Sequence, residues 1–251
     1  MKNHLLLVII CLVFGSCAVK QNKSSSQSIT HEAWTTMLSK HVSNSGIVDY
    51  AGFVKDSVAL NTYLAMLSQH HPNKKNWSSD ERKAYWINAY NAYTVQLIVQ
   101  NHPVKSIKDL GGSIYKVNTP WDKRFIFIEG TDYDLNNIEH DILRREWKDA
   151  RIHFAINCAS ISCPPLLNKA YEASTIGEQL DQVTADFINS PSKNTIAKRR
   201  VKLSRIFKWF SGDFDKDKGS LIEFINTYSD VQVSPDAEIS YRDYDWNLNG
   251  N

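Results

Sequence analysis

The chain has 251 residues, with 29 Lys and Arg against 27 Asp and Glu. Because these charges nearly cancel, the chain lacks the strong basic field that recruits nucleic acid, and no nucleic-acid partner is expected. Beyond residue 30 about 220 residues remain, enough for one domain with a sizeable core.

The first 16 residues have the order of a secretory signal: a charge at Lys2, an apolar stretch from Leu5 to Phe14, then Gly15 and Ser16. The apolar stretch is shorter than the roughly 17–25 residues of a membrane-spanning helix. With Cys17 directly after two small residues, the segment is similar to the cleavage box of bacterial lipoproteins. The similarity implies export and a lipidated Cys17 that anchors the protein to a bacterial membrane, facing the periplasm. Residues 17–30 are predicted to be a polar tether, and 31–251 the globular domain.

The first three elements that the sequence predicts, in chain order, are helices. Residues 29–42 and 57–72 have apolar side chains at helical spacing, and the second segment stops at Pro72. The clearest helix lies between Trp77 and Pro103, where Ser78 and Glu81 fit a capping box.

The next segments predict a mixture of strands and one more helix. In residues 124–135 apolar side chains alternate along the chain before a turn that contains glycine, which predicts a hairpin. Residues 136–147 predict a second capped helix. Residues 151–157, 200–203 and 231–234 are predicted strands, with the basic stretch at 193–202 as a solvated hairpin edge. The fold class is therefore α+β: a helix-rich single domain around a small, mostly antiparallel sheet.

Two asparagines on the long helix are candidate site residues. Asn88 and Asn91 are three apart on a helix that is apolar nearly all round, so both amides are expected to be buried. A buried amide without partners costs roughly 1–3 kcal/mol. The two side chains either brace the backbone of a neighbouring loop or orient groups in a site.

The second helix also carries candidates. His140 and Arg144 are four residues apart and share a face, and Glu139 is adjacent. A surface ion-pair ladder and a functional site explain this pattern equally well.

The sequence HFAINCASISCPPL, from His153 to Leu166, is the most distinctive stretch. On an extended strand His153 and Asn157 would share one face about 13 Å apart. A pairing of Cys158 with a histidine then requires a bend at Asn157 or a histidine from elsewhere, such as His140. The small residues and two prolines after Cys158 favour such a bend.

Four states of the two thiols stay open. Cys158 and Cys163 form a disulfide, which an exported compartment permits; or Cys158 is a nucleophile with a histidine base; or both are inert buried thiols; or they clip a metal. A zinc site needs about four ligands, and the sequence has no second cysteine pair for it.

The stretch DFDKDKG, from Asp213 to Gly219, is similar to part of a calcium loop. Counted from Asp213, the glycine and Glu223 miss the positions that such a loop requires. No metal and no cofactor are expected.

Six strings together resemble the family catalogued as domain of unknown function 547: GIVDYAGF, AYWINAYNAYTV, LNNIEHDILR, HFAINCASISCPPL, LSRIFKWF..DF and YDWNLN. The resemblance spans about Gly46 to Asn249. It implies a domain identity and no mechanism, since the family has no agreed activity. The positions that it carries across are Asn88, Asn91, Glu139, His140, Arg144, His153, Asn157, Cys158 and Cys163.

A helix packed on a small sheet near Cys and His is similar to papain-like and transglutaminase-like enzymes. Those enzymes resemble one another in placing the nucleophilic cysteine at the start of the central helix, and here that helix holds none.

Two hypotheses follow. The favoured one is a lipid-anchored envelope protein that binds an unknown ligand or is structural. The alternative is a thiol-dependent enzyme, hydrolase, transferase or redox, with Cys158 as nucleophile, His153 or His140 as base with Glu139 beside it, and Asn88, Asn91, Arg144 and Asn157 as orienting or binding residues.

Overall fold

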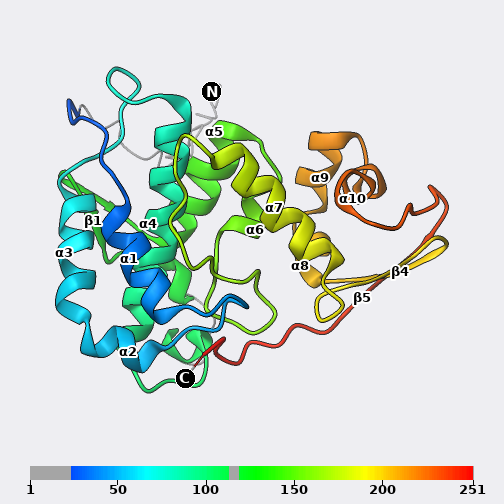
Figure 1. The fold of residues 1–251 in the computed structure, drawn as a ribbon, viewed down its shortest axis with the longest axis horizontal. Coiled ribbons are helices and arrows are strands. Elements are labelled where there is room, and N and C mark those ends of the chain that lie inside the picture. Colours follow the sequence, from blue (N-terminus) through cyan, green and yellow to red (C-terminus); the bar gives the residue numbers. More distant parts are fainter. Residues whose placement is uncertain (1–23, 113–118, 251) are drawn as a thin grey trace, which may run out of the picture.

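The fold is described from a computed structural model that covers residues 24–112 and 119–250. It is helix-rich with two small sheets, which confirms the α+β class (Figure 1). Its α-helices are α1 (Glu32–His41), α2 (Tyr50–Lys55), α3 (Ser57–Ser68), α4 (Ser79–Val99), α5 (Arg145–Trp147), α6 (Ile152–Ala155), α7 (Ile176–Asn189), α8 (Arg205–Trp209), α9 (Ser211–Lys218) and α10 (Leu221–Tyr228). Two 3₁₀ helices, η1 (Ile107–Leu110) and η2 (Pro120–Asp122), and a π-helix, η3 (Asn137–Arg144), complete the helical elements of these residues.

The single sheet that the sequence predicts is instead two separate sheets. Strands β1 (Ile126–Ile128) and β2 (Thr131–Tyr133) form the predicted hairpin. Strand β4 (Arg200–Leu203) pairs antiparallel with β3 (Thr195–Ala197) and parallel with β5 (Glu238–Tyr241). The basic hairpin is thus present, and in Figure 1 this second sheet projects from the right of the molecule.

Two strand predictions are wrong. At 231–234 the side chain of Asn226 binds both the N–H and the C=O of Val233, so a side chain satisfies the groups that a strand partner would. At 151–157 the chain forms the short helix α6, followed by extended backbone at Ile156. Residues 152–157 are all buried, and an apolar run buried on every side does not distinguish helix from strand.

The long central helix is α4, which begins where the sequence predicts. The Ser78 hydroxyl accepts from the Glu81 N–H, and the Glu81 carboxylate accepts from the Ser78 N–H, completing the capping box. Nearly all of its side chains from Ala84 to Ile98 are buried. The helix therefore forms the middle of the core, and its polar side chains must find partners inside the protein.

The core has two hydrophobic clusters that meet at α6. The first gathers around α1 to α4 and the β1–β2 hairpin, and the second around α7 to α10 and β4. Ile152 and Ala155 belong to the first cluster, whereas Phe154 belongs to the second. Side chains of α6 therefore join the two halves.

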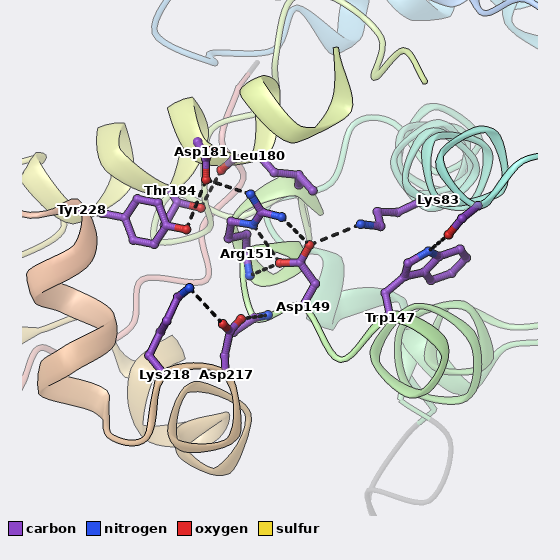
Figure 2. Close-up of polar contacts among 12 residues, drawn as sticks. Lys83, Trp147, Asp149, Arg151, Leu180, Asp181, Thr184, Asp217, Lys218 and Tyr228 are labelled. Atoms are coloured by element: carbon purple, nitrogen blue, oxygen red, sulfur yellow. Dashed lines mark hydrogen bonds and ion pairs between the residues drawn. The ribbon is translucent and has the colours of Figure 1, made fainter. Parts of the chain in front are cut away.

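A charged network fixes the start of α6 (Figure 2). The Arg151 guanidinium binds Asp149 and, 2.8 Å away, Asp181 of α7. Asp149 also lies 3.3 Å from the Lys83 amino group of α4, and Asp217 of α9 accepts from the Ala150 N–H. Elements of both halves thus hold the segment that leads to His153 and Cys158.

The C-terminal segment, residues 242–250, runs back from β5 along the lower edge of the molecule in Figure 1. Its Asn249 N–H donates to the Ala159 carbonyl, and Ile161 donates to the Asn247 carbonyl. Gly250 forms a bridge with Val48. The segment is therefore joined to the loop that carries the two cysteines.

Part of the predicted tether contacts the domain. The Ser26 carbonyl accepts hydrogen bonds from Asn73 and from the Trp77 indole, and Ile29 packs on the first cluster. The expected boundary at residue 31 thus falls inside a segment that already packs on the fold. The predicted signal at 1–16 and Cys17 lie outside the described residues. Within the described ranges, no helix has both the length and the apolar character needed to cross a bilayer.

Candidate functional site

A cavity of about 170 Å³ lies where the two hydrophobic clusters meet. It brings together five residues that the sequence singles out: Glu139, His140, His153, Cys158 and Cys163. The remaining lining residues are Tyr90, Trp121, Asn136, Ile156, Pro164, Ile206, Trp209, Phe210, Tyr244 and Trp246.

Cys158 is on the cavity wall, at the start of a loop that Asn157 holds. The buried Asn157 amide donates to the Pro164 carbonyl and accepts from the Ala159 N–H. Ala159 has a left-handed backbone, φ 59°, which supplies the predicted bend. Asn157 therefore shapes the loop, and it does not line the cavity.

Hydrogen bonds converge on the half-buried Cys158 sulfur. Its Sγ lies 3.3 Å from the Ser160 hydroxyl, 3.3 Å from the Tyr244 hydroxyl and 2.7 Å from the Cys163 Sγ. Burial raises the pKa of this thiol, but the hydrogen bonds from Cys163, Ser160 and Tyr244 outweigh that effect and lower it to about 7. Cys163 is fully buried, and burial together with the adjacent Cys158 raises its pKa well above the ordinary value.

Both cysteines are free thiols, so the disulfide state that the sequence leaves open is not the state of this structure. The described residues also contain no group of three or more His, Cys, Asp or Glu placed to hold a metal ion.

Glu139 faces the cavity from the π-helix η3. The residue is only 8% exposed, and the Tyr90 hydroxyl donates to its carboxylate at 3.4 Å. Burial, with a further contribution from the negative charge of Cys158, raises the pKa of this carboxyl to about 7. A carboxyl with that pKa can both give and take a proton near neutral pH.

The winding of η3 differs from the α-helix that the sequence predicts. Residues 135–147 are helical as expected, but the eight from Asn137 to Arg144 follow a π-helix. The predicted closeness of His140 and Arg144 holds, with 2.9 Å between His140 Nδ1 and Arg144 Nη1. π-Helical turns are rare in proteins as a whole, but those that occur are often found at functional sites.

His153 belongs to a chain of charged groups centred on Asp213. Its Nε2 lies 2.8 Å from Asp213 Oδ2, and the Arg144 Nε donates to the same oxygen at 2.6 Å. Hydrogen bonds from His153 and from Arg144 hold the pKa of Asp213 well below its ordinary value. Burial lowers the pKa of His153 although Asp213 opposes that shift, so the imidazole is neutral at pH 7.

The second ring nitrogen of His153 is unpartnered. With Nε2–H donated to Asp213, Nδ1 carries a lone pair, and this buried atom has no hydrogen-bond partner. The ring stacks on Phe210 with centroids 3.9 Å apart and is 3% exposed. His153 is thus a fixed, neutral imidazole that lines the cavity, and its unpartnered nitrogen has the protonation state that a general base requires.

Aromatic side chains form another part of the cavity wall. Trp209 packs on Tyr244 and Trp246 with ring centroids 4.7 and 5.9 Å apart, and Trp121 packs on Trp246 at 5.6 Å. Such rings provide a large apolar contact surface for a ligand.

The two asparagines of α4 lie behind the site. The Asn91 amide donates to the Ala155 carbonyl at 2.9 Å and accepts from the Asn157 N–H at 2.8 Å. Asn88 makes the same two kinds of bond to Tyr171. Both side chains thus brace loop backbone, which is one of the two roles that their burial predicts, and neither lines the cavity.

Arg144 does not line the cavity either. Its guanidinium lies over Phe210, 4.9 Å from the ring centroid, and binds Asp213. It acts on the site through those neighbours.

Sequence reasoning assigns no site role to Asp213 or Tyr244, nor to Trp209 and Trp246. Their signal is present in two of the strings that carry the family resemblance, since Trp209 and Asp213 belong to LSRIFKWF..DF, and Tyr244 and Trp246 to YDWNLN. Only the fold shows that these two segments lie near the two cysteines.

Residues 74–188 match the family model described as "Protein of unknown function, DUF547". The matched range contains all nine site positions predicted from the resemblance, but neither Asp213 nor Tyr244. No curated protein and no solved structure shows significant similarity to the chain. The match supports the family resemblance, and the family description assigns no activity.

Proposed function

We propose that this chain is an exported, lipid-anchored protein whose cavity performs thiol-dependent acyl transfer or hydrolysis, with Cys158 as the nucleophile. The observation that carries the proposal is the set of hydrogen-bond partners, Cys163, Ser160 and Tyr244, around the Cys158 sulfur on the wall of a cavity. They favour the thiolate, which is the nucleophilic form of cysteine.

The reaction begins with the Cys158 thiolate. It attacks a carbonyl carbon, a C–S bond forms, and the carbonyl electrons move onto oxygen; when they return, the bond to the leaving group breaks. Glu139 supplies the proton for that group, since it is still partly protonated near pH 7. The His153 Nδ1 then takes a proton from a water or an alcohol whose oxygen attacks the acyl carbon, while Asp213 holds the other nitrogen. A C–O bond forms, the C–S bond breaks, and Cys158 leaves as the thiolate.

The cavity limits the substrate. A space of about 170 Å³ is close to the roughly 150 Å³ of a buried site that holds benzene. The lining is rich in aromatic side chains. Since the cavity is partly open to solvent, we expect the part of the acyl group that enters it to be apolar and about one ring in size.

The test uses p-nitrophenyl acetate as an acyl donor for the reduced protein. Wild type should release p-nitrophenolate in a burst and carry an acetyl group on Cys158, detected by peptide mapping. Cys158→Ser should lose the burst. His153→Ala should keep the burst and slow the later turnover by about 100-fold or more, which is the usual contribution of a general base.

Iodoacetamide gives a readout that needs no substrate. The alkylation rate of Cys158 should rise with pH, and the midpoint of the rise should lie near the pKa of the thiol, about 7. Tyr244→Phe removes one hydroxyl donor and should move that midpoint up by about one to two pH units. An ordinary cysteine midpoint in wild type, with no acetylation, would contradict the proposal and leave a ligand-binding protein without chemistry.

The anchor is supported by the order of charge, apolar stretch and small residues before Cys17. In a bacterial host given a radioactive fatty acid, the wild-type chain should be labelled and sediment with membranes. Cys17→Ser should lose the label. A labelled variant, or an unlabelled wild type, would overturn this part.

A further inference from the structure

The two thiols are held together by a fixed loop. Cys158 and Cys163 have their sulfurs 2.7 Å apart, and the Cys158 N–H donates to the Cys163 Sγ at 2.8 Å. Asn157 binds the Pro164 carbonyl on one side, and the Lys193 amino group binds the Cys163 carbonyl at 2.8 Å on the other. Because both ends of the loop are fastened, the contact between the sulfurs does not depend on a chance rotamer of an exposed side chain.

The two sulfurs are not equivalent. Cys158 is half-buried and lies on the cavity wall, where the hydroxyls of Ser160 and Tyr244 stabilise its thiolate. Cys163 is 4% exposed, and burial keeps its proton in place. The outer thiol is therefore the one that is oxidised first, and the inner sulfur, 2.7 Å away, is placed to attack the oxidised product.

We propose that Cys158 is an oxidation site for small hydroperoxides and that Cys163 resolves the product as a disulfide. The inference goes beyond acyl transfer and does not depend on it, since it concerns only the two sulfurs and an oxidant that fits the cavity.

The first step oxidises Cys158. Its thiolate attacks the terminal oxygen of the hydroperoxide, an S–O bond forms and the O–O bond breaks. The alkoxide or hydroxide that leaves takes up a proton and departs as an alcohol or as water. Cys158 becomes a sulfenic acid, oxidised by two electrons, and the peroxide is reduced by the same two electrons.

The second step forms the disulfide. The Cys163 sulfur attacks the Cys158 sulfur, the S–S bond forms and the S–O bond breaks. The departing hydroxyl takes the proton of the Cys163 thiol and leaves as water. A dithiol returns the pair to the reduced state by thiol–disulfide exchange. Cys163 thereby protects Cys158 from the irreversible sulfinic and sulfonic states.

The experiment treats the reduced full-length protein with hydrogen peroxide, alkylates the remaining thiols at intervals and maps the cysteine peptides. In wild type, Cys158 and Cys163 should disappear together as one cross-linked peptide, and dithiothreitol should restore both. At pH 7 the reaction should be about 10-fold faster than that of free cysteine, because a larger fraction of Cys158 is thiolate.

The matched variants separate the two roles. Cys163→Ser should stop at a sulfenic acid on Cys158, which dimedone traps, and then proceed to sulfinic acid. Cys158→Ser should leave Cys163 reduced at the same peroxide concentration. The proposal is overturned if wild type accumulates sulfinic acid on Cys158 without the cross-link, or if Cys158 reacts no faster than free cysteine.

Two controls keep these outcomes interpretable. Circular dichroism checks that each variant is folded. If Cys163→Ser is not folded, the wild-type time course decides: dimedone added early should trap the sulfenic acid on Cys158 and so prevent the cross-link. The p-nitrophenyl acetate assay on untreated protein is read separately, so a failure of acyl transfer leaves the peroxide result intact, and the reverse also holds.

Discussion

A buried thiol ordinarily keeps its proton, because removal from water penalises the thiolate. Sequence reasoning therefore looks for a cation beside a reactive cysteine. At Cys158 the opposing groups are instead neutral donors, the thiol of Cys163 and the hydroxyls of Ser160 and Tyr244. Hydroxyl donors give no charge pattern in the sequence, which is why the stretch CASISC leaves the state of its thiols open.

Glu139 links the site to the pH dependence of stability. The folded protein keeps a proton on this carboxyl up to about pH 7, whereas the unfolded chain releases it near 4.5. The folded state thus binds more protons in this interval, and the free energy of unfolding contributed by Glu139 falls as the pH rises. Glu139→Gln should remove this fall and be more stable than wild type above pH 7 by up to about 3 kcal/mol.

Urea unfolding of both proteins, from pH 4.5 to above pH 7, measures that difference. The corresponding substitution at an exposed position, Asp230→Asn, serves as the control. Parallel profiles for wild type and Glu139→Gln would show that Glu139 does not hold its proton in the folded protein.

Elements differ in how far the sequence determines them. Helix α4 is predictable because its capping box and its long apolar run both indicate a helix that begins after Ser78. Helix α6 is not, because its four residues are buried and its start is fixed by partners on α4, α7 and α9. The burial of Asn91 is predictable from α4 alone, but its partners belong to the segment around α6.

Asn91→Ala tests the brace between these two elements. It leaves the Ala155 carbonyl and the Asn157 N–H without partners, which should lower the free energy of unfolding by roughly 2–4 kcal/mol. It should also raise the pH midpoint of Cys158 alkylation, since the loop that aims the thiol loosens. Urea unfolding and iodoacetamide kinetics measure the two effects.

Asn88→Ala is the matched control on the same helix. It removes the same two kinds of bond from Tyr171 and should cost a similar free energy of unfolding. The alkylation midpoint should stay where it is in wild type. Equal shifts of the midpoint in both variants would mean that Asn91 acts only on global stability.

At the scale of the whole molecule, the site depends on chain segments that are far apart in sequence. The α+β class and five of the cavity residues can be predicted from local patterns. Asp213 and Tyr244 belong to the site because they contact His153 and Cys158, which lie 60 and 86 residues earlier in the chain. No local periodicity encodes such contacts. The parallel pairing of β5 with β4 is not predicted for the same reason, since α8 to α10 lie between the two strands in the chain.

Gly250 tests the attachment of the C-terminal segment. A Cβ at this position would lie 1.8 Å from the Val48 carbonyl oxygen, so Gly250→Ala must displace the segment or the backbone at Val48. The expected loss in free energy of unfolding is about 1–3 kcal/mol, the usual cost of overpacking. Cys158 alkylation should change with it, because the same segment supplies Tyr244.

Gly177→Ala on α7 provides the comparison. Nothing lies within 4 Å of its added Cβ, and alanine is the better helix former by about 0.5–1 kcal/mol. This variant should be as stable as wild type or more so, with unchanged alkylation. If Gly250→Ala matched it in urea unfolding, the C-terminal segment would not be fastened at Val48.

The position of Tyr244, 86 residues after Cys158, has a consequence for biosynthesis. Until the segment that carries Tyr244 is synthesised and docked, the thiol lacks the phenol that tunes it, and the wall of Trp209, Tyr244 and Trp246 is incomplete. Reactivity of Cys158 is therefore expected to appear only after residues 242–250 have docked.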